Sequence, residues 1–275
     1  MSVLQARAWL PRTEGSVRLE FARRNGRTRL AVLRQAGAAR VRFPKVADGA
    51  APEAVLLNTA GGLTGGDRME TALTLGDGAA ATATTAAAEK IYRSREGDTS
   101  IDVRLALGPA AGLAWLPQPT ILFDGARLDR LTSVELAPDA RLLAVECLVF
   151  GRQAMGETLH HGSFRDAWRI RRSGRLVFAD TFRAGGDIAT ALGRPATLAG
   201  ARLAAMLIYV ATDAASRLEA VRGILQGQDC HAGASAWDGM LVVRAMAGDS
   251  RSLIRGIAPL VRELSGRPLP RVWQC

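Results

Sequence analysis

The sequence predicts a mainly β protein with two helices near its carboxyl end, forming one domain over residues 1–275. Apolar and polar residues alternate with a period of two through much of the first two thirds of the chain, which is the pattern of half-buried strands. Helical periodicity appears only late. No Pro/Ser-rich linker, charge block or repeat of fixed period divides the chain.

The strands are indicated by this alternation and by the turn-forming residues between them. Apolar Val17, Leu19 and Phe21 alternate with charged residues, and the same pattern runs over Ile101–Leu107. Each segment is therefore expected to bury one face. Further strands are predicted between Gly, Pro and Asp residues. They cover Arg29–Arg34, Ala54–Asn58, Arg68–Leu75, Thr120–Phe123, Leu128–Leu136 and Arg141–Phe150.

The last third begins with a hairpin and then becomes helical. Apolar residues two apart predict the hairpin over Trp168–Phe178, with its turn at Ser173-Gly174. One helix is predicted over Ala214–Gln226, where Gly227 can end it. Another is predicted over Ser252–Leu264, which carries a continuous apolar stripe.

Composition excludes several classes of protein. With 48% hydrophobic and 23% charged residues, the chain is neither disordered, collagen-like nor a coiled coil. Its three cysteines, Cys147, Cys230 and Cys275, have no Cys-x-x-Cys spacing, so neither a disulfide framework nor a zinc ribbon is indicated. The first residues do not resemble a signal peptide, and the apolar run Leu203–Ala211 is too short to span a membrane. A cytoplasmic protein is expected.

Positive charge is concentrated at the amino end. Residues 1–45 hold eleven basic side chains against two acidic ones, which is nearly all of the net charge of +10. Such clustering suits an acidic partner, because electrostatic steering acts only over about a Debye length. A solvated surface in an arginine-biased protein explains it equally well, since Lys45 and Lys90 are the only lysines.

A glycine-rich segment follows one predicted strand. Four glycines fall within six residues, Gly61 to Gly66, which implies positive φ angles or close approach to another surface. A P-loop would need a Gly-Lys-Ser/Thr ending that opens a helix, and a dinucleotide-binding loop would need a βαβ unit. Here Asp67-Arg68 follow and strands flank the segment. Nucleotide binding is therefore not predicted.

The residues give little support for catalysis. There is no Gly-x-Ser-x-Gly or His-Glu-x-x-His motif, and the three histidines match no Ser/His/Asp pattern. His160-His161 and Cys230-His231 are adjacent pairs, and neighbours on a strand point to opposite faces, which makes chelation by either pair awkward. The protein is expected not to be an enzyme.

Four segments of distinctive sequence occur in a fixed order. They read GGLTGGD from Gly61, TTAAAEKIYRS from Thr84, WLPQPTILFDGA from Trp115 and GRQAMGE from Gly151. Together they resemble the urease accessory protein UreD (UreH) family, from about residue 15 to Trp273. One departure is Pro119, where the family often carries an acidic residue.

The resemblance implies a fold and a function. The implied fold is an elongated, strand-rich β-helical stack with two helices. The implied function is that of a non-catalytic maturation chaperone that binds urease apoprotein. With UreF, and with the GTPase UreG acting through UreF, such a protein enables nickel insertion into urease. In a mechanism proposed for the family, Ni²⁺ passes through an internal channel, which makes nickel a transient ligand rather than a tightly bound cofactor.

Candidate site residues follow from the same four segments and the basic amino end. A passing divalent ion needs carboxylates, carbonyls and water rather than a closed cage. The acidic candidates for a nickel path are Asp67, Glu89, Asp124, Glu146 and Glu157. Each is equally well explained as a strand-end ion pair or a turn former. The candidates for partner binding are Arg23, Arg24, Lys90, Tyr92, Arg93 and Arg152.

An alternative from another class is a basic β protein that binds nucleic acid through residues 1–45. Proteins that bind single strands stack bases on aromatic rings. This stretch offers only Trp9, Phe21 and Phe43. The low aromatic content therefore argues against nucleic acid as the partner.

Overall fold

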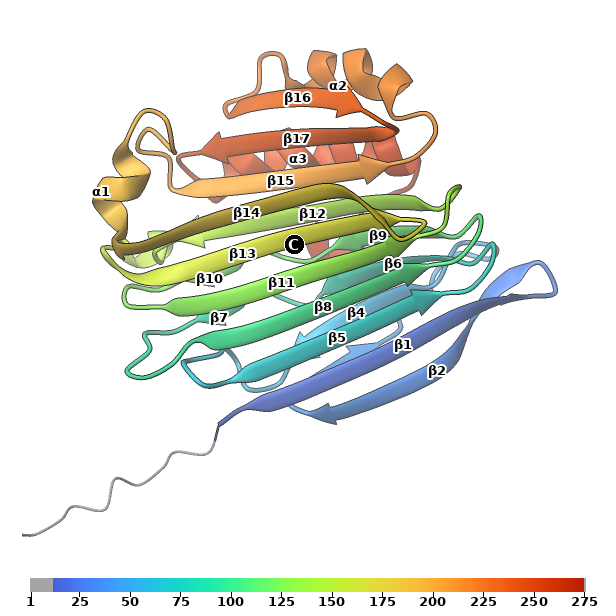
Figure 1. The fold of residues 1–275 in the computed structure, drawn as a ribbon, viewed down its shortest axis with the longest axis horizontal. Coiled ribbons are helices and arrows are strands. Elements are labelled where there is room, and N and C mark those ends of the chain that lie inside the picture. The colour runs from blue at the N-terminus through green and yellow to red at the C-terminus, as the bar shows by residue number, and fades with distance from the viewer. Residues whose placement is uncertain (1–11, 275) are drawn as a thin grey trace, which may run out of the picture.

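Two β-sheets lie face to face in the computed structural model, which describes residues 12–274 (Figure 1). The first sheet has seven strands. In order across the sheet they are β14 (Arg175–Asp187), β13 (His161–Arg172), β11 (Arg127–Leu136), β8 (Thr99–Leu107), β5 (Arg68–Leu75), β1 (Glu14–Arg24) and β2 (Arg27–Gly37). The strands β1, β5, β8, β11 and β13 run parallel to one another.

The second sheet has ten strands. Across its main path they are β16 (His231–Trp237), β17 (Met240–Ala247), β15 (Leu203–Val210), β12 (Arg141–Phe150), β9 (Gly112–Leu116), β6 (Ala80–Thr85), β4 (Glu53–Asn58) and β3 (Ala39–Arg42). Two short strands complete it beside β12, namely β10 (Thr120–Leu122) and β7 (Glu89–Ile91).

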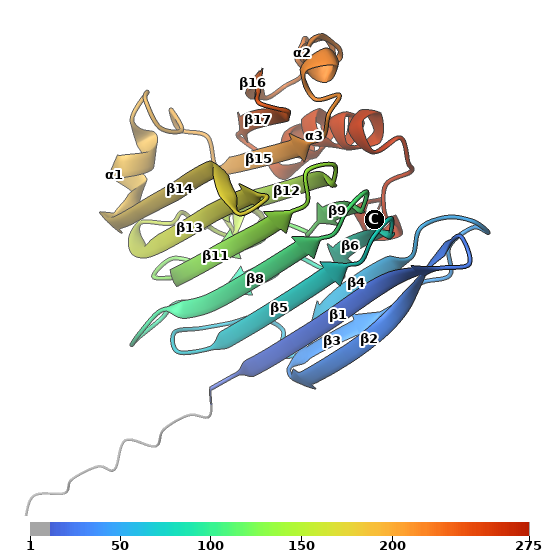
Figure 2. The ribbon, with the colours of Figure 1, turned by 45° about the vertical axis from the view of Figure 1, so that its right-hand side comes forward.

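The chain forms this pair of sheets by winding between them. Strand β5 leads to β6 and β7, β8 leads to β9 and β10, and β11 leads to β12, with equivalent strands stacked in parallel. Successive coils turn at residues 76–79, 108–111 and 137–140, here called the turn end. They return at residues 92–98, 123–126 and 151–160, here called the loop end. The predicted β-helical stack is confirmed, and Figure 2 shows the strands stacked along it.

All of the predicted strands and the hairpin are present, but several other strands were not predicted. The missed strands are β3, β6, β7, β9, β15, β16 and β17. Strand β15 is a continuous apolar run, LAAMLIYV, because neighbours cover both of its faces. Such strands show no alternation. Strands β6 and β9 are short and rich in alanine or threonine, so they too lack a clear period-two signal.

Both predicted helices are present near the carboxyl end. Helix α2 (Leu218–Leu225) follows a 3₁₀ turn over Ala215–Arg217, so the first residues of the predicted helix are not α-helical. Helix α3 (Ser250–Ser265) is capped by Asp249, which accepts a hydrogen bond from the Ser252 N–H at 2.9 Å. A third, short helix, α1 (Ile188–Gly193), was not predicted. No helix among residues 12–274 is long and apolar enough to cross a membrane.

The core has three apolar clusters. The turn-end cluster and the loop-end cluster both lie between the two sheets, and the outer cluster joins α2 and α3 to the outer face of the second sheet. The alternation of side chains along β12 explains how the inner clusters are separated from the outer one. Leu142 and Ala144 point into the turn-end cluster and Leu148 and Phe150 into the loop-end cluster, whereas the intervening odd-numbered residues face α3.

The last residues of the described chain close a break in the second sheet. This break lies at residues 117–119, between β9 and β10. Gln118 Nε2 donates a hydrogen bond to the Val272 carbonyl at 2.9 Å, and Trp273 Nε1 donates one to the Leu116 carbonyl at 3.0 Å. The carboxyl end is thereby fixed to a coil more than 150 residues earlier, as these pairs are separated by 154 and 157 positions.

The glycine-rich segment packs tightly against the next coil, as its sequence predicted. A Cβ at Gly62 would overlap the Tyr92 ring, and one at Gly65 would overlap Ser94 and the Glu96 and Gly97 carbonyls. Thr64 reinforces this contact by donating its hydroxyl to the Arg93 carbonyl at 2.9 Å. Gly62 and Gly65 therefore permit the close stacking of two coils.

We expect Gly65→Ala to destabilise the protein by about 1–3 kcal/mol, the usual cost of adding a methyl group where backbone atoms cannot move away. The matched control is Gly112→Ala in β9, where a Cβ would meet nothing within 4 Å. Chemical denaturation of both variants checks the difference. Equal stability of the two variants would show that the contact at Gly65 relaxes freely.

Candidate functional site

A layer of polar side chains crosses the interior between the turn-end and loop-end clusters. Arg130 on β11 is level with Asp166 on β13, its partner in the register. Glu146 on β12 faces them from the other sheet. All three side chains are about 6% exposed. Burying a polar layer between two apolar clusters costs desolvation free energy unless its charges compensate one another. The contacts within the layer therefore show how these charges are compensated.

Arg130 holds the centre of this layer. Its Nε and Nη2 donate to the two carboxylate oxygens of Asp166 at 2.9 and 2.7 Å, and its Nη1 donates to Thr120 Oγ1 at 2.9 Å. Nη1 also lies 2.8 Å from Glu146 Oε1. That oxygen accepts no well-aligned hydrogen bond from residues 12–274, although it is fully buried. Asp166 is thus the bidentate partner of Arg130, and Glu146 is the surplus acid.

The protonation of these groups follows from this arrangement. Burial, helped by the charge of the neighbouring Asp166, raises the pKa of Glu146 to about 8 against the opposing charge of Arg130. Burial opposes the Arg130 charge, but Asp166 and Glu146 outweigh it and raise the pKa of the guanidinium. Burial, followed by the charge of Glu146, raises the pKa of the Cys147 thiol to about 12. The layer therefore favours the charged form of Arg130 and increases the affinity of Glu146 for a proton.

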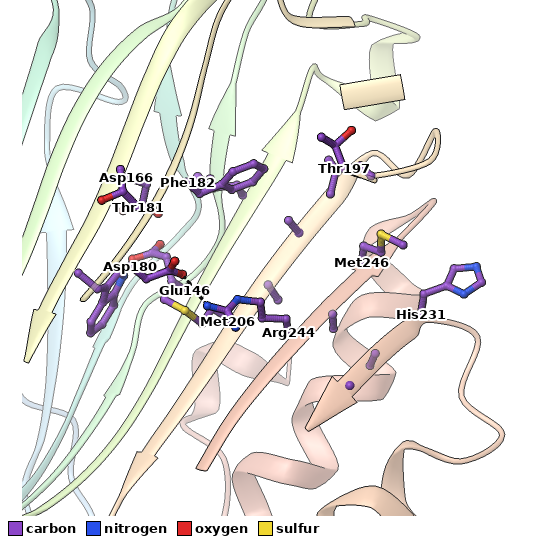
Figure 3. A pocket seen from close by; sticks show the side chains of 18 of the residues that line it. Glu146, Asp166, Asp180, Thr181, Phe182, Thr197, Met206, His231, Arg244 and Met246 are labelled. Carbon is purple, nitrogen blue, oxygen red and sulfur yellow. Dashed lines mark hydrogen bonds and ion pairs between the residues drawn. The ribbon is translucent and has the colours of Figure 1, made fainter. Parts of the chain in front are cut away.

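Two cavities meet at Glu146. One, of about 350 Å³, lies between the sheets on the side of β4 and β7, and Glu89, Arg130 and Glu146 are among its lining residues. The other, of about 720 Å³, lies between β14 and the strands β15 and β17, and Glu146 and Asp166 are among its lining residues (Figure 3). Glu146 lines both, whereas Arg130 lines the first alone and Asp166 the second alone.

The layer continues through the second cavity to the protein surface. Glu146 is level with Met206 on β15, which is level with Arg244 on β17. Arg244 Nη2 bridges the sheets to Asp180 Oδ2 at 3.0 Å, as Figure 3 shows. The Arg244 side chain is 60% exposed, so the polar layer reaches solvent here. His231, level with Met246, also lines this cavity, and its ring points away from Asp180 and Arg244 (Figure 3).

Of the five acidic candidates, the structure brings Glu89 and Glu146 together around the first cavity. Asn58 Nδ2 donates to Glu89 Oε1 at 3.1 Å. Burial raises the pKa of Glu89, although Asn58, the Lys90 N–H and the charge of Arg130 oppose the rise. Glu89 is therefore a half-buried acid whose pKa is lowered by the Arg130 charge and raised more strongly by burial.

The other three acidic candidates lie elsewhere. Asp67 is buried and accepts backbone hydrogen bonds from Thr13 and Thr64, both at 2.8 Å, which braces the glycine-rich segment. Asp124 and Glu157 lie at the loop end and form ion pairs, Asp124 with Arg93 at 3.0 Å and Glu157 with Arg152 at 2.9 Å. None of the three lines either cavity.

Three of the six candidates for partner binding form one surface at the loop end. Tyr92 packs edge-on against Phe123, with ring centroids 4.9 Å apart, and the Arg152 guanidinium lies 4.6 Å from the centre of the same ring. Arg93 is joined to the same turn through Asp124. Tyr92, Arg93 and Arg152 are all exposed. This group is here called the loop-end surface.

The remaining candidates lie apart from it. Lys90 is exposed next to Glu89. Arg23 and Arg24 are exposed at the opposite, turn end, beside the β1–β2 hairpin. Residues 1–11 of the basic stretch, with Trp9, lie outside the described residues, as does Cys275. Within the stretch, Phe21 is only 1% exposed and so offers no ring for stacking a base.

The histidines and cysteines of residues 12–274 do not form a metal centre. The backbone N–H groups of His160 and His161 donate to Asp124 Oδ1, and their rings lie 6.3 Å apart. Cys230 is half-buried and packs beside Gly256. Across residues 12–274, no three His, Cys, Asp or Glu side chains come together in a group that could hold a metal ion.

Comparison with known proteins gives a consistent family. The family model described as UreD urease accessory protein matches residues 13–274. A urease accessory protein UreD from Methylobacterium sp. (strain 4-46) is 52% identical over 269 residues, covering 96% of this chain and 95% of the relative. Those from Rhizobium leguminosarum bv. viciae and Xanthobacter autotrophicus are 44% and 45% identical, covering 99% and 97% of this chain and 99% and 92% of their own lengths.

The raised pKa of Glu146 predicts a pH-dependent contribution to stability. The native state keeps a proton that the unfolded chain loses, so stability falls as pH rises from about 4.5 to about 8. Glu146→Gln lacks this loss, and its stability relative to the parent protein should increase across this range. Urea unfolding at pH 5, 6.5 and 8 measures the difference. Glu157→Gln, at an acid whose pKa the Arg152 hydrogen bond lowers, should shift stability equally at all three values. A parallel dependence for Glu146→Gln would contradict the assignment.

Proposed function

This chain belongs to the UreD family of urease accessory proteins, and from this we propose that it is a non-catalytic chaperone that binds urease apoprotein and assists nickel insertion. In this proposal UreF and, through UreF, the GTPase UreG complete the assembly. Ni²⁺ is a passing cargo, and the chain holds no permanent cofactor. The relatives are named urease accessory protein UreD, which supports a role in urease maturation.

The polar layer is the observation that supports a nickel path through the protein. A divalent ion inside a protein is expensive to desolvate, and carboxylates at intervals along its route lower that cost. Here a half-buried carboxylate, Glu89, faces one cavity, Glu146 joins that cavity to the next, and Asp166 and Asp180 face the second. Carboxylate oxygens and the sulfur of Met206 are both acceptable transient ligands for nickel.

The direction of the path follows from the stacking of strands. The layer passes from Glu89 on β7 through β10, β11 and β12 to Arg244 on β17, across the strands rather than along them (Figure 1). Its far side reaches solvent near Asp180 and Arg244. A path across the stack connects opposite sides of the molecule, as a conduit between two partners requires.

Two surfaces are proposed for the partners. The loop-end surface offers exposed Tyr92, Arg93 and Arg152 around a partly buried ring, a combination typical of residues that dominate protein interfaces. Arg23 and Arg24 provide positive charge at the turn end. The two surfaces are well separated and can therefore contact different partners. Within residues 12–45, Phe43 is the only exposed aromatic ring, which favours a protein partner over nucleic acid.

We expect Glu89→Gln to reduce nickel loading of co-expressed urease several-fold, because the neutral amide no longer offsets the cost of moving a dication. The nickel content and activity of urease are measured together with co-purification of the partners. Asp129→Asn is the matched control, since its side chain lies on the outer face of β11 and pairs with Arg165 at 2.6 Å. Full loading with Glu89→Gln, or equal loss in both variants, would contradict the path.

The β1–β2 hairpin, which carries Arg23 and Arg24, should govern the rate at which the chain associates with urease apoprotein. Reversing Arg23 and Arg24 to Glu should weaken capture of urease apoprotein at low salt and have less effect at high salt, because long-range charge mainly changes the encounter rate. Association kinetics at several ionic strengths measure the effect. Reversing Arg251 and Arg255, exposed on α3, makes the same charge change elsewhere and should alter the rate less. Unchanged rates at every salt concentration would remove the hairpin from the interface.

A further inference from the structure

We propose that Arg130 prevents Glu146 and Asp166 from holding a divalent cation, so that the polar layer conducts nickel without storing it. The inference rests on the proposed nickel path. It assigns a specificity-determining role to a buried arginine that lines the first cavity at its junction with the second. Arg130 would act on nickel through the two carboxylates that it occupies, rather than as a ligand.

The contacts of Arg130 use the carboxylates that a metal would need. Two of its nitrogens engage both oxygens of Asp166 at 2.9 and 2.7 Å, and a third lies 2.8 Å from Glu146 Oε1. A guanidinium is charged at any physiological pH and cannot lose its proton to make way for a metal. The space between the two carboxylates is therefore already filled by a cation.

Without the Arg130 guanidinium, the same two carboxylates would attract a metal ion strongly. Both side chains are about 6% exposed, and two uncompensated buried carboxylates are far more costly than two that share a counter-ion. A divalent ion would neutralise both at once and gain their oxygens as ligands. Such an ion would be held tightly, and delivery to a partner would slow.

With Arg130 present, an arriving dication encounters a different balance. It must either displace the guanidinium from Asp166 or bind beside a fixed positive charge. Glu146 is the weaker of the two partners, because its buried Oε1 lacks a well-aligned hydrogen bond from residues 12–274. A passing ion can therefore contact Glu146 briefly while Asp166 remains paired. The arrangement favours transfer between the cavities over retention at their junction.

The proposal is tested by nickel bound to the purified full-length chain. Arg130→Gln, Arg130→Gln/Glu146→Gln, Glu146→Gln and the parent protein are incubated with Ni²⁺ and passed through a desalting column, and retained nickel is measured by mass spectrometry. We expect Arg130→Gln to retain about one more ion per chain than the parent, and the double variant to lose that ion. Arg165→Gln, which removes an exposed arginine from the same pair of strands, is the matched control and should gain none.

Several outcomes would overturn the proposal. Folded Arg130→Gln that retains no extra nickel, verified by circular dichroism and thermal unfolding, would show that Arg130 only supports the fold. If Arg130→Gln does not fold, the nickel retained by Glu146→Gln tests the proposal instead. Unchanged nickel retention supports the proposal, and loss of an ion from the parent level shows that the junction stores metal despite Arg130.

Co-expression with urease separates this proposal from the nickel path itself. Extra nickel on Arg130→Gln with reduced loading of urease supports both. Extra nickel with normal loading of urease supports the role of Arg130 at the junction and contradicts the path. No extra nickel on folded Arg130→Gln, together with reduced loading of urease by Glu89→Gln, overturns the role of Arg130 and supports the path.

Discussion

Compensation of buried charge at Arg130 is the constraint on which the interior of this protein depends. Two sheets with apolar inner faces would normally close on a continuous core, as the clusters on either side of the layer do. A charged residue at an inward position cannot be buried unless partners surround it. Asp166 on the neighbouring strand and Glu146 on the facing sheet supply these partners. The core is thereby split in two, and the cavities lie along the division.

Much of the fold could be predicted because many of its strands and both later helices have one buried and one solvated face. Strand β11 alternates over its whole length, and the two later helices carry apolar stripes. Prediction failed where this contrast disappears. Strand β15 is covered on both faces, and short strands such as β9 hold too few residues to show a period. Their positions are determined by pairing with strands distant in the sequence, which periodicity does not reveal.

The candidate site was predicted only in part. Glu89 and Glu146 were found because they lie in or near distinctive segments, whereas Arg130 and Asp166 lie in ordinary alternating strands. A local signal existed, since Arg130 occupies the same phase as buried Leu128 and Val134, and Asp166 the same phase as Phe164 and Trp168. That these two side chains meet depends on strand register across 36 residues.

The closure of the second sheet by Val272 and Trp273 has a consequence for the order of assembly. Residues 117–119 emerge from the ribosome long before the residues that fasten them, so earlier coils can stack while this wall is still open. Pro117 and Gln118 also line the first cavity. The coils can therefore form progressively during synthesis, whereas the enclosed interior is completed only when residues 272–273 have been made and have docked. A chain without residues 272–273 would leave the Leu116 carbonyl and the Gln118 amide at this break without these partners, so the wall beside the first cavity would remain unfastened.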